Sequence, residues 1–376
     1  MQPTTTFTNA PLDGSRLAQP LDDLLADLVA DGRIPGVSLA VTTSTTLLYA
    51  GGSGWADLQR HCPASADTPF LWFSLTKIAT ATAAMALADH GRLDLDAAVN
   101  DYLPSYPTSR RGARPVVRQL LDHTAGLPNP LPVRWIRPAA ADAPDPATFL
   151  ARLLTKHGTV KHPIGGPARY SNLGYLTLAE VIATAVGEPF VDVLRDVVLD
   201  PAGMTNTGFT HRADTPTATG HVRVPRPLGI ALKAYLPAGT VGQRTGRQIA
   251  FEPFVVDGPG YGGLIGDVID AARLARLHLA DGIIDGHRVL APDTAQRMRT
   301  ISTPGKPVDL GLGWYRKHDT AAGPPHVEHI GAGGGYCNVM RIYPELDLGL
   351  VVMANTTARY DHDTLFDRII TLTSRR

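Results

Sequence analysis

The sequence predicts an α+β fold, in which an antiparallel sheet flanked by helices carries an inserted, mostly helical domain. Apolar β-type runs occur near both ends of the chain, at 37–58 and at 310–357, and short turns join them. Short hairpin connections favour antiparallel pairing. Between about 92 and 220, apolar residues recur at helical spacing between Pro and Gly breaks, and no convincing strand is seen there.

The length of the chain predicts two domains. At 376 residues it exceeds what one ordinary hydrophobic core holds. We expect a discontinuous α/β sheet domain formed by residues 1–80 and 260–376, covered by the first and last helices. Residues 81–259 are expected to form the mostly helical domain, with a possible lid near 222–256. A cleft at such a boundary is a common binding site.

Composition and charge exclude several classes of protein. The 44% apolar and 19% charged content is that of a globular protein, and the zero net charge argues against a nucleic-acid partner. Cys62 and Cys337 show no metal-type spacing, so we expect two buried free thiols, with a single long-range disulfide as the alternative. No apolar stretch reaches the roughly 20 residues that a membrane span needs. The N-terminus lacks a secretory leader, so we expect a soluble, cytoplasmic protein without a membrane partner or an obligatory protein partner.

One serine and one lysine stand out at the start of the stretch 73–91. Ser74 and Lys77 are three residues apart and share a helix face. The residues that follow are uncharged as far as Asp89, which predicts a helix buried all round. Burial disfavours the ammonium form of Lys77, so its amine can accept the proton of the Ser74 hydroxyl. The alternative is that Ser74 is only a helix cap.

Two further motifs complete a candidate hydrolase site. In Tyr170-Ser171-Asn172, a phenol can relay a proton and an amide can donate to a substrate carbonyl. The alternative is that Ser171 or Asn172 only caps a helix. After His329, glycines at 331 and 333–335 precede a β-type run, and exposed backbone N–H groups there could form half of an oxyanion hole. The alternative is a Gly-rich turn beside a satisfied histidine.

Together, Ser74-Leu75-Thr76-Lys77, Tyr170-Ser171-Asn172 and His329-Ile330-Gly331 resemble the three motifs of the serine penicillin-recognising enzymes. That family includes class C β-lactamases, D-alanyl-D-alanine carboxypeptidases and related esterases. The order and spacing of the motifs agree, and the resemblance covers most of residues 20–365. It implies an antiparallel sheet flanked by helices, together with a mostly helical domain.

The resemblance also implies roles for individual residues. Ser74 would be the acylated nucleophile, and Lys77 and Tyr170 would share proton transfer, with Lys77 keeping Tyr170 acidic. Which of the two is the base for acylation stays open. The backbone N–H groups of Ser74 and Ala332 would form the oxyanion hole.

Substrate binding is assigned by the same resemblance to Asn172, His329 and Gly331. No cofactor is expected. No metal is expected either, because the histidines, including His318 and His326, lack ligand spacing.

One departure from the family pattern guides the functional prediction. The third motif of β-lactamases usually begins with a lysine that holds the carboxylate of the antibiotic, whereas here it begins with His329, which is mostly neutral near pH 7. We therefore predict an esterase-like serine hydrolase that forms an acyl-enzyme on Ser74 with a small ester or amide. The alternatives are a D-amino-acid peptidase or carboxypeptidase, a weak β-lactamase, an acyltransferase, or a non-catalytic binding protein of the same fold.

Two other segments are ambiguous or excluded. The segment 222–256 carries Arg223, Arg226, Lys233, Arg244 and Arg247, with no acidic residue between the first and the last. It is either a lid that selects an acidic or bulky acyl group or a solvated basic loop. The glycines at 258, 260 and 263 match GxGxxG, but no βαβ unit surrounds them, so a dinucleotide site is not expected.

Overall fold

The computed structural model of the protein describes residues 14–107, 112–318, 323–358 and 360–374. Residues 1–13, on which the expectation of no secretory leader partly rests, lie outside the described residues, as do the last two residues of the expected C-terminal helix.

The elements follow one another in the order expected for two strand-rich ends and a helical middle. The strands are β1 (Gly36–Thr42), β2 (Leu47–Asp57), β3 (Cys62–Pro63), β4 (Phe70–Leu71), β5 (Ile136–Pro138), β6 (His221–Arg223), β7 (Val241–Thr245), β8 (Gln248–Phe251), β9 (Phe254–Val256), β10 (Ile265–Gly266), β11 (Ile283–Ile284), β12 (His287–Arg288), β13 (Val308–Leu310), β14 (Tyr315–Lys317), β15 (Val327–Gly333), β16 (Tyr336–Tyr343) and β17 (Leu348–Ala354). The α-helices are α1 (Ala18–Val29), α2 (Thr76–Asp89), α3 (Val99–Tyr102), α4 (Val117–Leu121), α5 (Pro146–His157), α6 (Asn172–Val186), α7 (Phe190–Leu194), α8 (Arg226–Tyr235), α9 (Pro259–Gly262), α10 (Val268–Leu279), α11 (Pro292–Arg299) and α12 (His362–Ser374). Short 3₁₀ or π turns are η1 (Gly14–Arg16), η2 (Phe73–Leu75), η3 (Arg195–Leu199) and η4 (Pro344–Leu346).

An eight-stranded antiparallel sheet joins the two ends of the chain, which confirms the predicted fold class. Its strand order is β13-β14-β15-β16-β17-β1-β2-β3. The N-terminal strand β1 pairs with the C-terminal strand β17, with Val37 opposite Ala354. This pairing across the whole chain places the third motif, on β15, in the same sheet as residues that precede the first motif.

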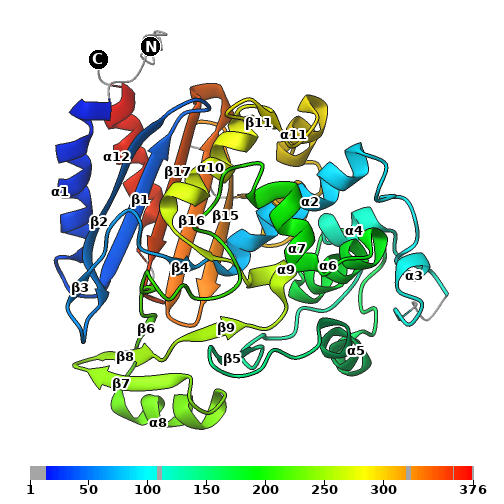
Figure 1. Ribbon diagram of the computed structural model, residues 1–376, viewed down its shortest axis with the longest axis horizontal. Helices are drawn as coiled ribbons and strands as arrows, with labels where there is room; N and C mark the ends of the chain where they lie inside the picture. The colour runs from blue at the N-terminus through cyan, green and yellow to red at the C-terminus, as the bar shows by residue number, and fades with distance from the viewer. Residues whose placement is uncertain (1–13, 108–111, 319–322, 359, 375–376) are drawn as a thin grey trace.

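Both faces of the sheet are buried, because apolar side chains point to each face in turn along the strand. Along β1, Val37, Leu39 and Val41 pack in one cluster with α1 and α12, while Ala40 belongs to the larger cluster on the other face. Successive residues of a strand point to opposite faces, so the run of apolar residues in β1 is what a sheet covered on both sides requires. Figure 1 shows α1 and α12 against one face and α10 against the other.

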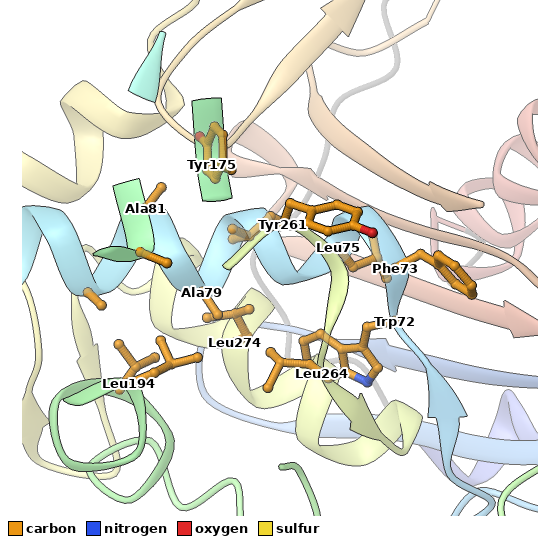
Figure 2. Packing of buried hydrophobic residues seen from close by; sticks show 14 of the residues in the cluster. Trp72, Phe73, Leu75, Ala79, Ala81, Tyr175, Leu194, Tyr261, Leu264 and Leu274 are labelled. Carbon is orange, nitrogen blue, oxygen red and sulfur yellow. The ribbon is translucent and has the colours of Figure 1, made fainter. Parts of the chain in front are cut away.

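Helix α2 lies within the core of the helical part of the molecule. Every residue from Thr76 to Leu87 is buried, as its uncharged sequence predicts. Around it, one hydrophobic cluster continues from the sheet to helices α4, α6, α7 and α10. Figure 2 shows Trp72, Phe73 and Leu75 at the beginning of α2, with the ring of Tyr261 beside them. The division at residues 80 and 260 stays a prediction.

The structure corrects two sequence predictions about secondary structure. The region 92–220 contains a strand, β5, which pairs with β9. The segment 222–256, in which no regular structure was predicted, contains it, because β6, β8 and β7 form a three-stranded sheet beside α8. Its role as a lid stays a prediction. Strands of three to five residues show no measurable period, and they form here because a neighbouring strand completes their hydrogen bonds.

Two smaller predictions can be compared with the described residues. Cys62 and Cys337 are not joined by a disulfide, as expected, but both are half-buried and not buried. Each helix in the described part of the chain falls short of the length and apolar character needed to cross a membrane.

Candidate active site

Ser74 sits in the short turn η2, immediately before α2. The preceding residue, Phe73, has φ = +48°, a left-handed conformation that is strained for a bulky residue. The turn is held by Trp72, whose backbone N–H donates to the Leu264 carbonyl at 2.8 Å and whose indole donates to the Gly266 carbonyl at 3.1 Å. The strained turn leaves Ser74 only partly buried, although residues on both sides of it are buried.

Lys77 is fully buried and makes three contacts through its Nζ atom. Nζ lies 2.8 Å from the side-chain carbonyl oxygen of Asn172, 2.8 Å from the backbone carbonyl oxygen of Tyr261 and 3.0 Å from Ser74 Oγ. Burial holds the pKa of Lys77 well below its usual value. In the neutral form that burial favours, the amine has two N–H donors for the two carbonyl oxygens and one lone pair for the Ser74 hydroxyl, whereas in the ammonium form it donates to all three oxygens. The predicted proximity of Ser74 and Lys77 is therefore present.

Tyr170 lies against the same two residues. Its ring centroid is 4.9 Å from Lys77 Nζ, and the Ser74 side chain lies close enough to the Tyr170 hydroxyl to act on its pKa. Burial raises the pKa of Tyr170, while the Ser74 side chain acts in the opposite direction. The expectation that Lys77 keeps Tyr170 acidic is therefore wrong for the free protein, since desolvation of the phenolate outweighs the favourable contacts.

The two residues after Tyr170 have different roles in the structure. Ser171 is the N-cap of α6, because its hydroxyl accepts from the Gly174 N–H at 3.1 Å. Asn172 is buried in the first turn of α6, and its side-chain oxygen is the partner of Lys77. Capping by Ser171 thus fixes where α6 begins, and this places Asn172 beside Lys77.

Strand β15 brings the third motif alongside the turn that carries Ser74. A Cβ atom on Gly331 would overlap the backbone carbonyl oxygen of Trp72, so only glycine allows this approach. Successive N–H groups of an antiparallel strand point to alternate sides. The Ile330 N–H donates to the Tyr315 hydroxyl at 2.9 Å, so the Ala332 N–H, two residues later, points to the same side. Pairing with β14 is limited to Tyr315 opposite Glu328, so no described strand covers β15 at Ala332.

His329 is buried behind the site. Its side chain is 2% exposed and packs between the rings of Tyr170 and Tyr315, with centroids 6.0 and 4.7 Å away. Burial, followed by the charge of Lys77, lowers the pKa of His329 to about 3, so the imidazole is neutral near pH 7 as expected. It is not among the residues that line the cavity beside Ser74. A role in holding substrate directly stays a prediction, and the observed ring contacts are with Tyr170 and Tyr315.

A cavity of about 330 Å³ opens at Ser74. It is lined by Phe73, Ser74, Pro132, Val133, Ile136, Asn172, Val222, Leu232, Leu236, Phe251, Tyr261, Ala332, Gly333, Gly334, Gly335 and Thr357. Among these described lining residues, none carries a charge. Ser74, Asn172, Tyr261 and Thr357 supply its polar side chains, and aliphatic and aromatic side chains with three glycines supply most of the rest of the wall.

Comparison with known proteins assigns the chain to a family. The family model described as Beta-lactamase matches residues 21–372, which is nearly the whole chain. The chain belongs to the β-lactamase family. This confirms the resemblance seen in the three motifs, and it makes the protein a member of a serine hydrolase superfamily with esterase and peptidase members.

Relatives in the β-lactamase family include both kinds of enzyme. Esterase EstB of Burkholderia gladioli is 27% identical over 375 residues and is aligned over 92% of both chains. The D-alanyl-D-alanine-carboxypeptidase/endopeptidase AmpH of Escherichia coli K12 is 25% identical over 292 residues, covering 74% of this chain and 69% of AmpH. Among solved structures, SurE superimposes with a TM-score of 0.74 at 28% identity, covering 96% of this chain and 76% of SurE.

Several residues of this β-lactamase-family site were missed by the sequence analysis. The GxGxxG stretch forms α9, whose Tyr261 and Gly260 carbonyls accept hydrogen bonds from Lys77 and from Thr80. Behind Tyr170, the ring of His123 stacks at 4.7 Å. A backbone carbonyl has no side-chain signature, so only the packing of α9 against α2 reveals its role. The glycines were a visible signal of close backbone approach, since a Cβ on Gly260 would crowd the Tyr175 carbonyl.

One group of potential metal ligands lies away from Ser74. Glu328, His362 and Asp363 each offer an atom within 4.8 Å of the others. However, Arg341 donates to both carboxylates, and Lys317 Nζ lies 3.2 Å from Glu328. Two side-chain cations already neutralise these carboxylates, so the group is a buried ion network.

Proposed function

We propose that this protein is a carboxylesterase that forms an acyl-enzyme on Ser74 with small, apolar, uncharged esters or amides. The observation that carries the proposal is the position of Lys77 Nζ. Two of its three contacts are carbonyl oxygens, which can only accept hydrogen bonds, so a neutral amine presents its lone pair to the Ser74 hydroxyl. Because burial favours this neutral form, Lys77 is the base in the acylation step.

Acylation begins with attack of Ser74 Oγ on the carbonyl carbon of the substrate. The hydroxyl proton passes to Lys77 Nζ as the new C–O bond forms. The N–H groups of Ser74, in the first turn of its helix, and of Ala332, on the uncovered side of β15, would hold the oxyanion. Both residues line the cavity, which supports this role.

Expulsion of the leaving group requires a proton on its oxygen or nitrogen. Tyr170 lies beside Ser74 and Lys77, and its raised pKa keeps it a neutral phenol that can donate. We propose that Tyr170 gives its proton to the leaving group as the C–O or C–N bond breaks and regains one from the Lys77 ammonium. A water molecule from solvent then attacks the acyl-enzyme, and its proton returns Ser74 to the hydroxyl form.

The cavity wall supports an ester of apolar, uncharged character as substrate. A β-lactam or a D-alanyl peptide carries a carboxylate, and no cationic side chain lies among the described residues that line the cavity. His329, at the position where a β-lactamase usually has lysine, is buried and held neutral. The likeness to the esterase EstB over 92% of both chains agrees with this substrate class.

Intact-mass spectrometry tests this proposal. The protein is mixed with p-nitrophenyl butyrate, a cephalosporin or a D-alanyl amide, and we expect an acyl adduct with the butyrate ester that is absent in Ser74→Ala. The exposed Ser302→Ala serves as the matched control and should keep the adduct. Faster turnover of the cephalosporin or the D-alanyl amide than of the ester would instead favour a β-lactamase or a peptidase. Ester hydrolysis that persists in Ser74→Ala would refute the mechanism, and the absence of both an adduct and turnover with every probe would indicate a binding protein.

A further inference from the structure

Helix α8 exposes apolar side chains on the side that faces away from the cavity. Leu228, Ile230 and Tyr235 have exposed fractions of 57, 76 and 57%. Ala231 and Ala234, between them, are exposed as well. At 100° per residue, the exposed apolar positions of α8 span an arc of roughly 160° of the helix circumference, and Arg226 and Lys233 both fall outside this arc. A helix of a water-soluble protein ordinarily turns such a face inward.

The opposite face of α8 is already used by the protein. Leu232 and Leu236 line the cavity that contains Ser74. A Cβ on Gly229 would crowd Ile249 of β8, and the Arg244 guanidinium donates to the Val224 carbonyl at 2.9 Å. One face of α8 therefore packs on the sheet of β6, β7 and β8. The exposed apolar face is a second face of the helix, which does not contribute to this packing. Figure 1 shows α8 at the lower edge of the molecule, next to β7.

A second apolar residue group borders the same cavity. Among the described residues, five large apolar side chains are exposed, and Leu131, at 76%, is one of them. It precedes Pro132 and Val133, which line the cavity. The Arg134 side chain donates to the backbone carbonyl of Tyr235 at 3.2 Å, so this loop is joined to the end of α8. Four of the five exposed apolar side chains thus lie on the two segments that border the cavity.

Exposed cations lie along one edge of this apolar face and on the neighbouring sheet. Arg223, Arg226, Lys233 and Arg247 are exposed, and the sequence has no acidic residue between Asp214 and Glu252. The whole chain is neutral, so this is a local excess. Apolar side chains flanked by exposed cations match a layer of anionic headgroups over acyl chains.

We propose that α8 is a docking helix that holds the protein against a surface of anionic amphiphiles. Leu228, Ile230 and Tyr235 enter the apolar layer, and Arg226 and Lys233 lie at the headgroups. Docking there brings the cavity mouth to the surface, so an ester with an apolar acyl chain reaches Ser74 without crossing water. The expectation of no membrane partner rested on the lack of a spanning segment, and a helix that lies on a surface needs none.

A second copy of the chain fits this face less well. In a two-fold symmetric interface the same patch meets itself. Such an interface would bring the arginines and lysine of one segment toward those of the other, with no acidic residue between Asp214 and Glu252 to pair with them. Anionic headgroups supply the missing negative charge.

Flotation of the full chain with vesicles tests the proposal without any need for catalysis, so its failure is separate from failure of the esterase proposal. We expect binding to vesicles of equal parts phosphatidylcholine and phosphatidylglycerol and much weaker binding to phosphatidylcholine alone. The triple variant Leu228→Ser, Ile230→Ser, Tyr235→Ser should bind at least about tenfold less. Arg226→Gln and Lys233→Gln should each weaken binding roughly fivefold. Trp55→Ser, which removes the exposed apolar side chain on β2, is the matched control and should bind as the unchanged protein does.

Two further measurements test whether α8 docks on the vesicle surface when the triple variant cannot be used. If the triple variant does not fold, flotation is repeated with the single variant Ile230→Ser. Independently, the fluorescence emission of Tyr235→Trp should shift to the blue with anionic vesicles only. Absence of flotation by the unchanged protein, or equal binding to both vesicle types, would overturn the proposal. A dimer that dissociates in Ile230→Ser, seen by sedimentation equilibrium without vesicles, would assign the face to a second copy and overturn it as well.

Discussion

Lys77 Nζ lies 3.0 Å from Ser74 Oγ. Its two other hydrogen-bond partners are the side-chain oxygen of Asn172 and the backbone carbonyl oxygen of Tyr261. The pair comes from one turn of chain at the beginning of α2, whereas the carbonyls belong to α6 and α9. The amine is therefore held by three segments that are far apart in the sequence, and its protonation state is set by their packing. Each prediction below tests one consequence of this arrangement or of its surroundings.

Replacing Lys77 by arginine should abolish fast acylation. Arginine keeps the positive charge but cannot lose its proton, so it cannot accept the proton of Ser74. We expect the acylation rate with p-nitrophenyl butyrate, measured by stopped-flow absorbance, to fall by about 10²–10⁴. The exposed Lys161→Arg is the control. Wild-type acylation in Lys77→Arg would return Lys77 to a structural role.

The pH dependence of acylation should report Lys77 and not Tyr170. The rate should rise with pH as Lys77 loses its proton, with a midpoint well below the usual lysine pKa of 10.5. Burial raises the pKa of Tyr170, so no second rise is expected near pH 10. The midpoint should persist in Tyr170→Phe, although the overall rate falls. A midpoint that disappears in this variant would make Tyr170 the base.

The buried His278 should make the protein less stable in mild acid. Its Nε2 lies 3.0 Å from Thr82 Oγ1, and its Nδ1 accepts from the Trp314 indole at 3.3 Å. Burial lowers its pKa from 6.5 to about 3, so its contribution to stability is complete above pH 6.5 and is lost as the pH falls toward 3. From pH 7 to 5 this single group should reduce the free energy of unfolding by about 2 kcal/mol.

Urea unfolding at pH 7 and at pH 5 measures this effect. His278→Gln should show a smaller difference between the two conditions than the wild type, and the exposed His287→Gln should not. An equal pH difference in wild type and His278→Gln would show that other groups carry the acid sensitivity.

Gly331→Ala should disturb the site through the backbone of Trp72. Its new Cβ would overlap the Trp72 carbonyl and crowd Leu75, on either side of Ser74. We expect a loss of stability of about 1–3 kcal/mol in urea unfolding, together with slower acylation. Gly208→Ala is the matched control, because a Cβ there meets nothing within 4 Å. If both variants behave alike, the close approach of β15 to η2 is not required.

The wall of the cavity should set acyl-chain preference. Each added methylene buried there should raise kcat/KM roughly fourfold from acetate to butyrate. Leu232→Trp fills part of the cavity and should reduce butyrate hydrolysis while largely sparing acetate. Leu228→Trp, on the exposed face of the same helix, should leave the ratio of the two rates unchanged. A ratio that is unaffected by Leu232→Trp would place the acyl group elsewhere.

Local sequence patterns were sufficient to predict part of the fold and part of the candidate site. The apolar β-type runs near both ends of the chain predicted a sheet built from both ends. The uncharged run after Lys77 predicted a fully buried α2. Ser171 was correctly offered as a helix cap. These features depend on residues within a few positions of one another, so a reader of the sequence can recognise them.

The sequence by itself determined that Ser74 and Lys77 share a helix face and that this helix is buried, because helical periodicity and side-chain polarity are local properties. Only the tertiary structure decided that the Tyr261 carbonyl and Asn172 orient the amine, that burial keeps Tyr170 a neutral phenol, and that α8 turns apolar side chains both toward the cavity and toward solvent. Those outcomes depend on desolvation and on contacts between segments separated by about a hundred residues or more, and no local pattern encodes them.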